Sequence, residues 1–163
     1  MAAVAAMLLD TADADVQRNG CRALANPTFD AAARKQAQAI VDAGGIAAVV
    51  AAMEQHAEDA MLQRFGCGAL MSMSCKDAAR TQAVVSAGGV AAIVAAMSQH
   101  TADVETQRNG CGALAHLTSD VDACKQVIVD AGGVAAVVAA TGQHAEDAVL
   151  QRCRTYAPVL TPR

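Results

Sequence analysis

Residues 40–70 read IVDAGGIAAVVAAMEQHAEDAMLQRFGCGAL, and closely similar stretches begin at Val84 and at Ile128. The paired glycines of these copies stand at 44/45, 88/89 and 132/133, so the period is 44 residues. A fixed period of this length is typical of solenoid proteins, in which each unit buries its apolar face only by stacking on its neighbours. The sequence therefore predicts one stacked domain over 1–163.

Three helices are expected in each full unit. The first, over about 33–43, ends at Gly44-Gly45, where glycine can adopt the left-handed backbone of a helix cap. The second runs from Ile46 to His56, with apolar residues at i, i+3, i+4 and i+7 and alanines on the other face. The third covers about 58–72, with Glu58 and Asp59 in its first turn, where acidic residues complement the helix dipole. Glycine recurs inside it at 20, 66 and 110, which predicts a helix crossing too close for a methyl group.

The unit boundaries follow from this repetition. A partial unit covers 1–30 and begins at its second helix, full units cover 31–74 and 75–118, and the last unit, 119–163, degenerates near its end. Arg154 stands where the other copies have glycine, and Pro158 stands where they have leucine. Because burial of an unpaired arginine is costly, the last helix is expected to fray or to face solvent. Copies this similar arise by recent duplication or by design, and the sequence leaves a natural chain, a fragment and an engineered chain open.

Composition excludes several classes of protein. A formal net charge of −4 argues against nucleic-acid binding, which needs clustered basic residues. No uninterrupted apolar run approaches the roughly 20 residues of a membrane span. The N-terminus MAAVAAMLLD lacks the basic start of a signal peptide, so a cytoplasmic or nuclear location is expected. Cys21, Cys67 and Cys111 recur with the unit, which favours reduced core packing over a disulfide framework.

No residue pattern indicates catalysis, a cofactor or a metal. His56, His100 and His144 recur once per unit, which places neighbours about 10 Å apart, whereas a shared zinc ion needs bonds of about 2.0–2.1 Å. They are interpreted as polar residues at helix ends. The cysteines outside the repeated core position, Cys75, Cys124 and Cys153, have no histidine and acid in the same repeat position that would make a nucleophile. Neither a glycine-rich phosphate loop nor HExxH is present, so we expect a non-enzymatic protein.

The phrases AGGIAAVVAAM (43–53) and VQRNGCRALAN (16–26), within a three-helix unit of this length, resemble the armadillo repeat over nearly the whole chain. HEAT repeats are the second possibility, but they have two helices and no such glycine pair. The resemblance implies an all-α, right-handed superhelix whose third helices line a concave groove for extended peptides. In peptide-binding members a Trp and, one turn later, an Asn project from each third helix into the groove. Here the Trp position is held by Arg22, Gly68, Gly112 and Tyr156, and the Asn position by Asn26, Ser72, His116 and Leu160, so an importin-type ladder for basic signals is not expected.

One turn before the Trp position, each third helix carries an arginine. Residues at i, i+4 and i+8 share a helix face, and the predicted concave peptide-binding set is Arg18, Arg22, Asn26, Arg64, Ser72, Arg108, His116, Arg152 and Tyr156. Arginine pairs bidentately with carboxylate or phosphate, which predicts a groove for an acidic or phosphorylated segment. The alternative is that these arginines only solvate the face, or pair with the chain's own Asp15, Glu58, Asp59 and Glu105.

The expected function is therefore a protein–protein interaction scaffold that holds an extended, acidic peptide of another protein. Self-association is the alternative, as a homo-oligomer such as a dimer formed through the repeat ends or through the alanine-rich second helices. It is suggested by a chain that starts within a unit and ends in a degraded one, without polar capping repeats.

Overall fold

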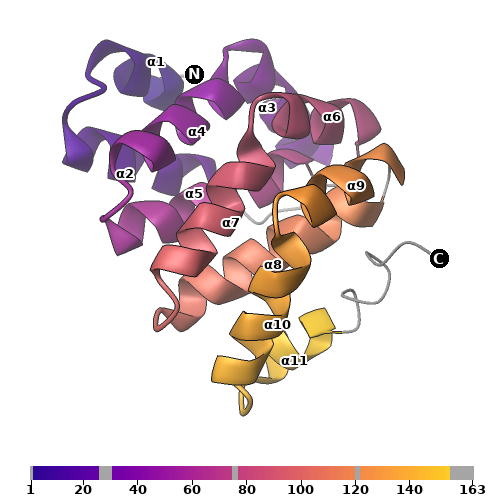
Figure 1. The fold of residues 1–163 in the computed structure, drawn as a ribbon. Coiled ribbons are helices and arrows are strands. Elements are labelled where there is room, and N and C mark those ends of the chain that lie inside the picture. Colours follow the sequence, from indigo (N-terminus) through magenta and orange to yellow (C-terminus); the bar gives the residue numbers. More distant parts are fainter. Residues whose placement is uncertain (1, 26–30, 75–76, 120–121, 155–163) are drawn as a thin grey trace.

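The structure, a computed structural model, describes residues 2–25, 31–74, 77–119 and 122–154. Within these ranges every regular element is a helix, which confirms the all-α class (Figure 1). The helices are α1 (Ala2–Leu9), α2 (Ala14–Leu24), α3 (Ala31–Asp42), α4 (Gly45–Gln55), α5 (Ala60–Ser74), α6 (Ala78–Ser86), α7 (Gly89–Gln99), α8 (Val104–Ser119), α9 (Asp122–Asp130), α10 (Gly133–Gln143) and α11 (Ala148–Cys153).

The three-helix unit repeats as expected. First helices are α3, α6 and α9, second helices are α1, α4, α7 and α10, and third helices are α2, α5, α8 and α11. The predicted start of the third helix was wrong, because α5 begins at Ala60 and Glu58 and Asp59 precede its first turn. The Oδ1 atom of Asp59 instead accepts the Leu62 N–H at 3.0 Å. Asp59 is thus a helix cap, which satisfies a backbone donor that the helix leaves unpaired.

The repeated glycine pairs bend the chain between the first and second helices. Gly44, Gly88 and Gly132 have φ of 81°, 82° and 80°, the left-handed region that glycine enters without a Cβ penalty. The bends they produce are 69°, 67° and 68°. Among the described residues no single helix is long and apolar enough to cross a membrane, although the three bent pairs reach the needed length and composition when each is taken together.

In α2, α5 and α8, the glycine inside the third helix allows a close approach to the second helix of the same unit. A methyl group added at Gly20, Gly66 or Gly110 would lie 2.3, 2.6 or 2.5 Å from the Cγ atom of Met7, Met53 or Met97, respectively. The predicted crossing is therefore confirmed, and its partner is a methionine.

The fourth unit has lost both members of this glycine–methionine pair. Thr141 stands at the methionine position and Arg154 at the glycine position. Arg154 is exposed and α11 ends at Cys153, so this arginine faces solvent as expected. The helix itself does not, because Leu150 and Cys153 are buried and α11 packs against α8. Pro158 and the rest of the expected ragged end lie outside the described residues.

A glutamine near the start of each third helix donates hydrogen bonds to carbonyl groups at the end of the preceding second helix. The Nε2 atom of Gln63 donates to the carbonyl oxygens of Met53 at 2.8 Å and His56 at 3.0 Å. Gln17, Gln107 and Gln151 make the same pair of bonds in their own units. Carbonyls at a helix C-terminus have no partner within the helix, so the glutamine supplies the missing donor.

The repeated histidines join successive units. The Nε2 atom of His56 lies 3.1 Å from the Thr11 carbonyl oxygen, that of His100 lies 2.7 Å from the Ala57 oxygen, and that of His144 lies 2.8 Å from the Thr101 oxygen. Because a carbonyl can only accept, Nε2 carries the proton in each bond. The histidines are polar residues at helix ends, as interpreted from the sequence, and each holds its unit to the one before.

Candidate functional site

The predicted arginines lie on the half-exposed sides of the third helices, which pack against one another in the order α2, α5, α8 and α11 (Figure 1). Exposed and partly exposed residues recur every three or four positions, as expected for one side of a helix. We call this surface the arginine face; it comprises Asp15, Arg18, Asn19 and Arg22 of α2, Met61, Arg64, Phe65, Met71 and Ser72 of α5, and Glu105, Arg108, Asn109, Gly112 and His116 of α8.

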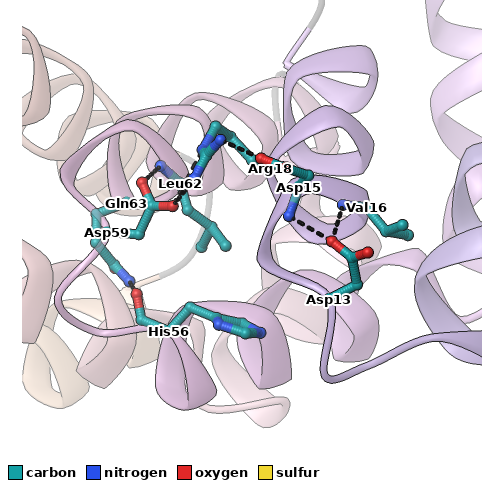
Figure 2. A network of polar contacts seen from close by, with 8 residues as sticks. All are labelled: Asp13, Asp15, Val16, Arg18, His56, Asp59, Leu62 and Gln63. Carbon is teal, nitrogen blue, oxygen red and sulfur yellow. Dashed lines mark hydrogen bonds and ion pairs between the residues drawn. The ribbon is translucent and has the colours of Figure 1, made fainter.

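Arg18 pairs with carboxylates from its own unit and from the next (Figure 2). Its Nε atom donates to Asp59 Oδ2 at 3.0 Å, and its Nη2 donates to the same oxygen. Its Nη1 donates to Asp15 Oδ1 at 2.5 Å. The guanidinium therefore bridges α2 to the cap of α5, and two carboxylates surround one positive charge.

Arg108 has the same environment two units later. Its Nε donates to Asp147 Oδ2 at 3.0 Å, its Nη2 donates to the same oxygen, and its Nη1 donates to Glu105. Asp147 caps α11 by accepting the N–H groups of Val149 and Leu150, both at 3.0 Å. The alternative, in which these arginines pair with acids of the chain itself, therefore holds for Arg18 and Arg108.

Of the four acids named for that alternative, three are arginine partners: Asp15, Asp59 and Glu105. Glu58 is the exception, because its Oε1 accepts a hydrogen bond from Gln99 Nε2 at 2.7 Å.

Arg64, between these two arginines, differs from both. Its guanidinium carbon lies 4.8 Å from the centroid of the Phe65 ring, a cation–π contact. Within the described part of the chain, no carboxylate lies within ion-pair distance of it. Its side chain is half-buried, so the charged group remains accessible from the arginine face.

Two residues explain why Arg64 lacks the pairs that Arg18 and Arg108 make. Three residues before it stands Met61, where Arg18 and Arg108 have an acid. The cap that corresponds to Asp59 is Asp103, and its Oδ2 atom already accepts the Thr106 hydroxyl at 3.3 Å. After Asp59 and Asp147 the corresponding residue is leucine, which leaves Oδ2 open to arginine.

Glycine at two of the Trp positions brings neighbouring third helices together. A methyl group at Gly68 would lie 3.3 Å from Ala25 Cβ and 3.5 Å from Asn109 Nδ2, and Gly68 is buried. Asn109 Nδ2 donates to the Arg64 carbonyl oxygen at 3.0 Å, so this asparagine links α8 to α5. The space that a Trp would need at Gly68 is therefore taken by the two adjoining helices.

The remaining predicted site residues fall into three groups. Arg22 and Arg152 are exposed. Ser72 and His116 are partly exposed on α5 and α8. Asn26 and Tyr156 lie outside the described residues. Met61, Phe65 and Thr106, which set the state of Arg64, were not identified from the sequence, although a comparison of the residues flanking each arginine across the units would have found them.

Two of the carboxylates paired with arginine, Asp59 and Asp147, are easier to ionise than usual. For Asp59, burial acts to raise the pKa, but the hydrogen bonds from Arg18 and from the Leu62 N–H outweigh it and the pKa is lowered. For Asp147, the hydrogen bond from Arg108 and the Leu150 N–H lower the pKa to about 2. Both carboxylates are therefore ionised at neutral pH, and each group of one arginine and two acids carries a net charge of −1.

The described cysteines are free and buried, in agreement with the predicted reduced packing for Cys21, Cys67 and Cys111. Burial raises the pKa of Cys21 and of Cys67 to about 12. Cys75 lies outside the described residues. No cluster of three His, Cys, Asp or Glu residues suited to a metal ion occurs among the described residues.

Residues 77–119, which include α6, α7 and α8, match the family model of the armadillo/beta-catenin-like repeat. The chain is therefore similar to armadillo-like repeat proteins, in the sequence of one unit and in the order of its helices. Among solved structures, the array is similar to the crystal structure of an engineered protein, with 28% sequence identity and a TM-score of 0.77. The similarity covers 98% of the array and 62% of the length of that engineered protein. The comparison with curated proteins gives no match.

Armadillo repeats generally mediate protein–protein interaction, and their family is a non-enzymatic scaffold type. The all-α solenoid expected from the sequence is thus confirmed.

Proposed function

We propose that the arginine face binds an extended segment of another protein, and that Arg64 holds an acidic side chain of that segment. The observation that carries this proposal is the contrast between the arginines: Arg18 and Arg108 are each held by two carboxylates, whereas Arg64 rests on the Phe65 ring. A guanidinium stacked on a ring keeps its N–H edge available for a bidentate carboxylate or phosphate.

The surroundings of Arg64 suit a peptide that combines charge with apolar character. Met61 is 49% exposed, and Phe65 and Met71 are partly exposed on the same side of α5. Apolar contact beside a charge-assisted hydrogen bond is the usual composition of an interface hot spot, in which a few residues supply most of the binding free energy. Ser72 offers a hydroxyl about two turns beyond Arg64 on α5.

The sequence predicted a row of arginines that bind acidic side chains, and this proposal assigns that role to Arg64 alone. Arg18 and Arg108 lie in groups whose net charge is −1, so neither presents an excess of positive charge to a ligand. The acid-binding position is therefore the middle of the array.

The proposal is tested by fluorescence anisotropy with labelled nine-residue peptides that carry one central Glu or phosphoserine between neutral residues. Replacement of Arg64 by Gln should weaken binding by roughly tenfold or more, since a hydrogen bond to a charged group contributes about 1.5–3 kcal/mol. The matched control is Lys35→Gln, which removes one exposed positive charge from α3, away from this face. Equal binding by the wild type and Arg64→Gln would contradict the assignment, as would no binding of either peptide by the wild type.

Self-association is a second candidate, and the exposed leucines of α1 favour it. Leu8 and Leu9 are 57% and 88% exposed, at positions where the later units have Glu54-Gln55, Ser98-Gln99 and Gly142-Gln143. Adjacent exposed leucines on a helix end are suited to contact with a second copy of the chain.

Sedimentation velocity over a concentration series tests this candidate. The variant Leu8→Glu/Leu9→Gln gives α1 the residues of α4 at these positions and leaves the buried Val4 and Met7 unchanged. If α1 mediates association, the wild type should sediment as a larger species than the variant at tens of micromolar. Two monomers, or two identical oligomers, would rule it out.

A further inference from the structure

Building on the proposed binding of an acidic side chain at Arg64, we propose that the arginine face selects a charge pattern. The preferred partner is an extended segment with an acidic residue at the centre and basic residues about three positions away on each side. The basic residues face Asp15 at one end and Glu105 at the other. A uniformly acidic segment is therefore a poor ligand.

The first step of the argument is charge. Each flanking arginine is outnumbered by carboxylates, since Arg18 faces Asp15 and Asp59 while Arg108 faces two acids in the same arrangement. Asp15 is 78% exposed, whereas its fellow carboxylate Asp59 is only 18% exposed. One carboxylate is in excess over Arg18, and the more exposed of the two, Asp15, is the one that solvent or a ligand can reach.

The same division holds at the other end of the face. The Glu105 side chain is 42% exposed and the Asp147 side chain 11%, so Asp147 serves the helix cap and Glu105 remains accessible. Arg22 is exposed as well, but it stands in the last turn of α2, whereas Asp15 stands in the first. Apart from Arg22, the accessible charges alternate as negative, positive and negative from Asp15 through Arg64 to Glu105.

The second step is spacing. Packed helices lie about 8–10 Å apart, so successive positions of this charge pattern are separated by about that distance. A polyproline II segment advances about 3.1 Å per residue and completes a turn in three, so side chains at i−3, i and i+3 point to the same side about 9 Å apart. The spacing of the helices and the three-residue advance of polyproline II are thus about equal. The ligand conformation that fits all three charges is therefore polyproline II.

The third step is what the pattern excludes. An acidic residue three positions from the central one would lie against the carboxylate of Asp15 or Glu105, and like charges placed together are unfavourable. The net charge of −4 adds a repulsion of the same sign at longer range. Selectivity thus comes from repulsion at the flanks together with attraction at the centre.

The sequence differences among the units supply substitutions that test this pattern. Met61→Glu gives Arg64 the acid that Arg108 has in Glu105. Thr106→Val copies Val16 of the first unit and leaves Asp103 Oδ2 open to Arg64. Either change should neutralise Arg64 without removing it.

The experiment measures the anisotropy of three labelled peptides with the full chain at low salt. One has Lys at i−3 and i+3 around a central Glu, the second has Gln at those flanks, and the third has the composition of the first with its two Lys placed together at one end. The first should bind roughly tenfold more tightly than the second, which is the contribution of two exposed ion pairs. The third should bind no better than the second.

The double variant Asp15→Asn/Glu105→Gln should bind the first two peptides equally, and with the wild-type affinity for the Gln-flanked one. Met61→Glu should weaken the binding of both peptides, because it gives Arg64 a carboxylate partner. Thr106→Val, a change at a buried position, should weaken both for the same reason. If the Gln-flanked peptide binds and the Lys-flanked one is no tighter, or if the rearranged peptide matches it, the charge pattern is wrong and the role of Arg64 stands. If none of the three peptides binds, the proposed function itself fails.

Discussion

The glutamine that joins each third helix to the preceding second helix offers a sharp test of how the array is stabilised. Gln63 is 2% exposed, and its Nε2 donates to the carbonyl oxygens of Met53 and His56 at 2.8 and 3.0 Å. Replacement by methionine keeps the length and approximate volume of the side chain and removes both donors. The loss therefore reports on the hydrogen bonds with little contribution from a cavity.

The expected magnitude follows from what each carbonyl retains. His56 O still accepts the Asp59 N–H at 3.1 Å, so losing its second bond costs about 1 kcal/mol. Met53 O loses a buried partner, which costs about 1–3 kcal/mol. Burial of the more apolar methionine chain returns about 1 kcal/mol. Gln63→Met should therefore lower the free energy of unfolding by about 1–3 kcal/mol.

Urea denaturation followed by circular dichroism measures this loss, as a shift of the midpoint at constant m-value. Gln151→Met, at a half-buried position whose second bond is 3.3 Å, should cost about 1 kcal/mol. Gln38→Met is the control, because that side chain is exposed and bonds only Asp42 of its own helix. If Gln63→Met cost no more than Gln38→Met, the tie between the two helices would not stabilise the fold.

Three further predictions concern packing, acid stability and thiol reactivity. Gly66→Ala should destabilise the chain by about 1–3 kcal/mol in thermal denaturation, because the added methyl would lie 2.5 Å from Met53 Sδ; a second change, Met53→Ala, should relieve part of this, and strict additivity would contradict the account. The pKa of Asp147 is about 2 against an ordinary 3.8, so the stabilisation that its carboxylate provides should be complete above pH 4 and lost as the pH falls to 2. The unfolding free energies of the wild type and Asp147→Asn should therefore converge at low pH. A difference that stays constant with pH would refute the link to Arg108. A hydrogen bond from Cys111 lowers the pKa of Cys153 to about 7, so iodoacetamide at pH 8 should modify Cys153 before Cys67, and mass spectrometry showing equal rates would count against this.

Local features of the fold were predictable from the sequence because they depend on residues within one or two helical turns. The glycine pair gave the position of each bend, and Gly44, Gly88 and Gly132 do adopt positive φ. The glycine inside each third helix indicated a close crossing, but its partner methionine lies in another helix and was found only in the structure. The third helix was predicted to start two residues early, because an acidic residue can act either in the first turn or as a cap.

The arginine face shows the limit of this reasoning. The repeat placed Arg18, Arg64 and Arg108 on equivalent sides of their helices. That register was compatible with a ligand-binding row, and also with arginines that solvate the face or pair within the chain. The structure divides the set, because Arg18 and Arg108 are paired while Arg64 stacks on Phe65. That division depends on single residues, Met61 and Thr106, whose effect requires knowing which acid lies within reach.

By itself, the sequence determined an array of three-helix units and an arginine that recurs at one position of every third helix, because periodicity, glycine and capping act over a few residues of chain. Only the tertiary structure decided which arginine remains available to a ligand. The carboxylates Asp59 and Asp147, which pair with Arg18 and Arg108, stand 41 and 39 residues further along the chain, in the next unit. Whether such a pair forms depends on how the units stack and on whether the acceptor oxygen is already occupied, and neither is a property of the local sequence.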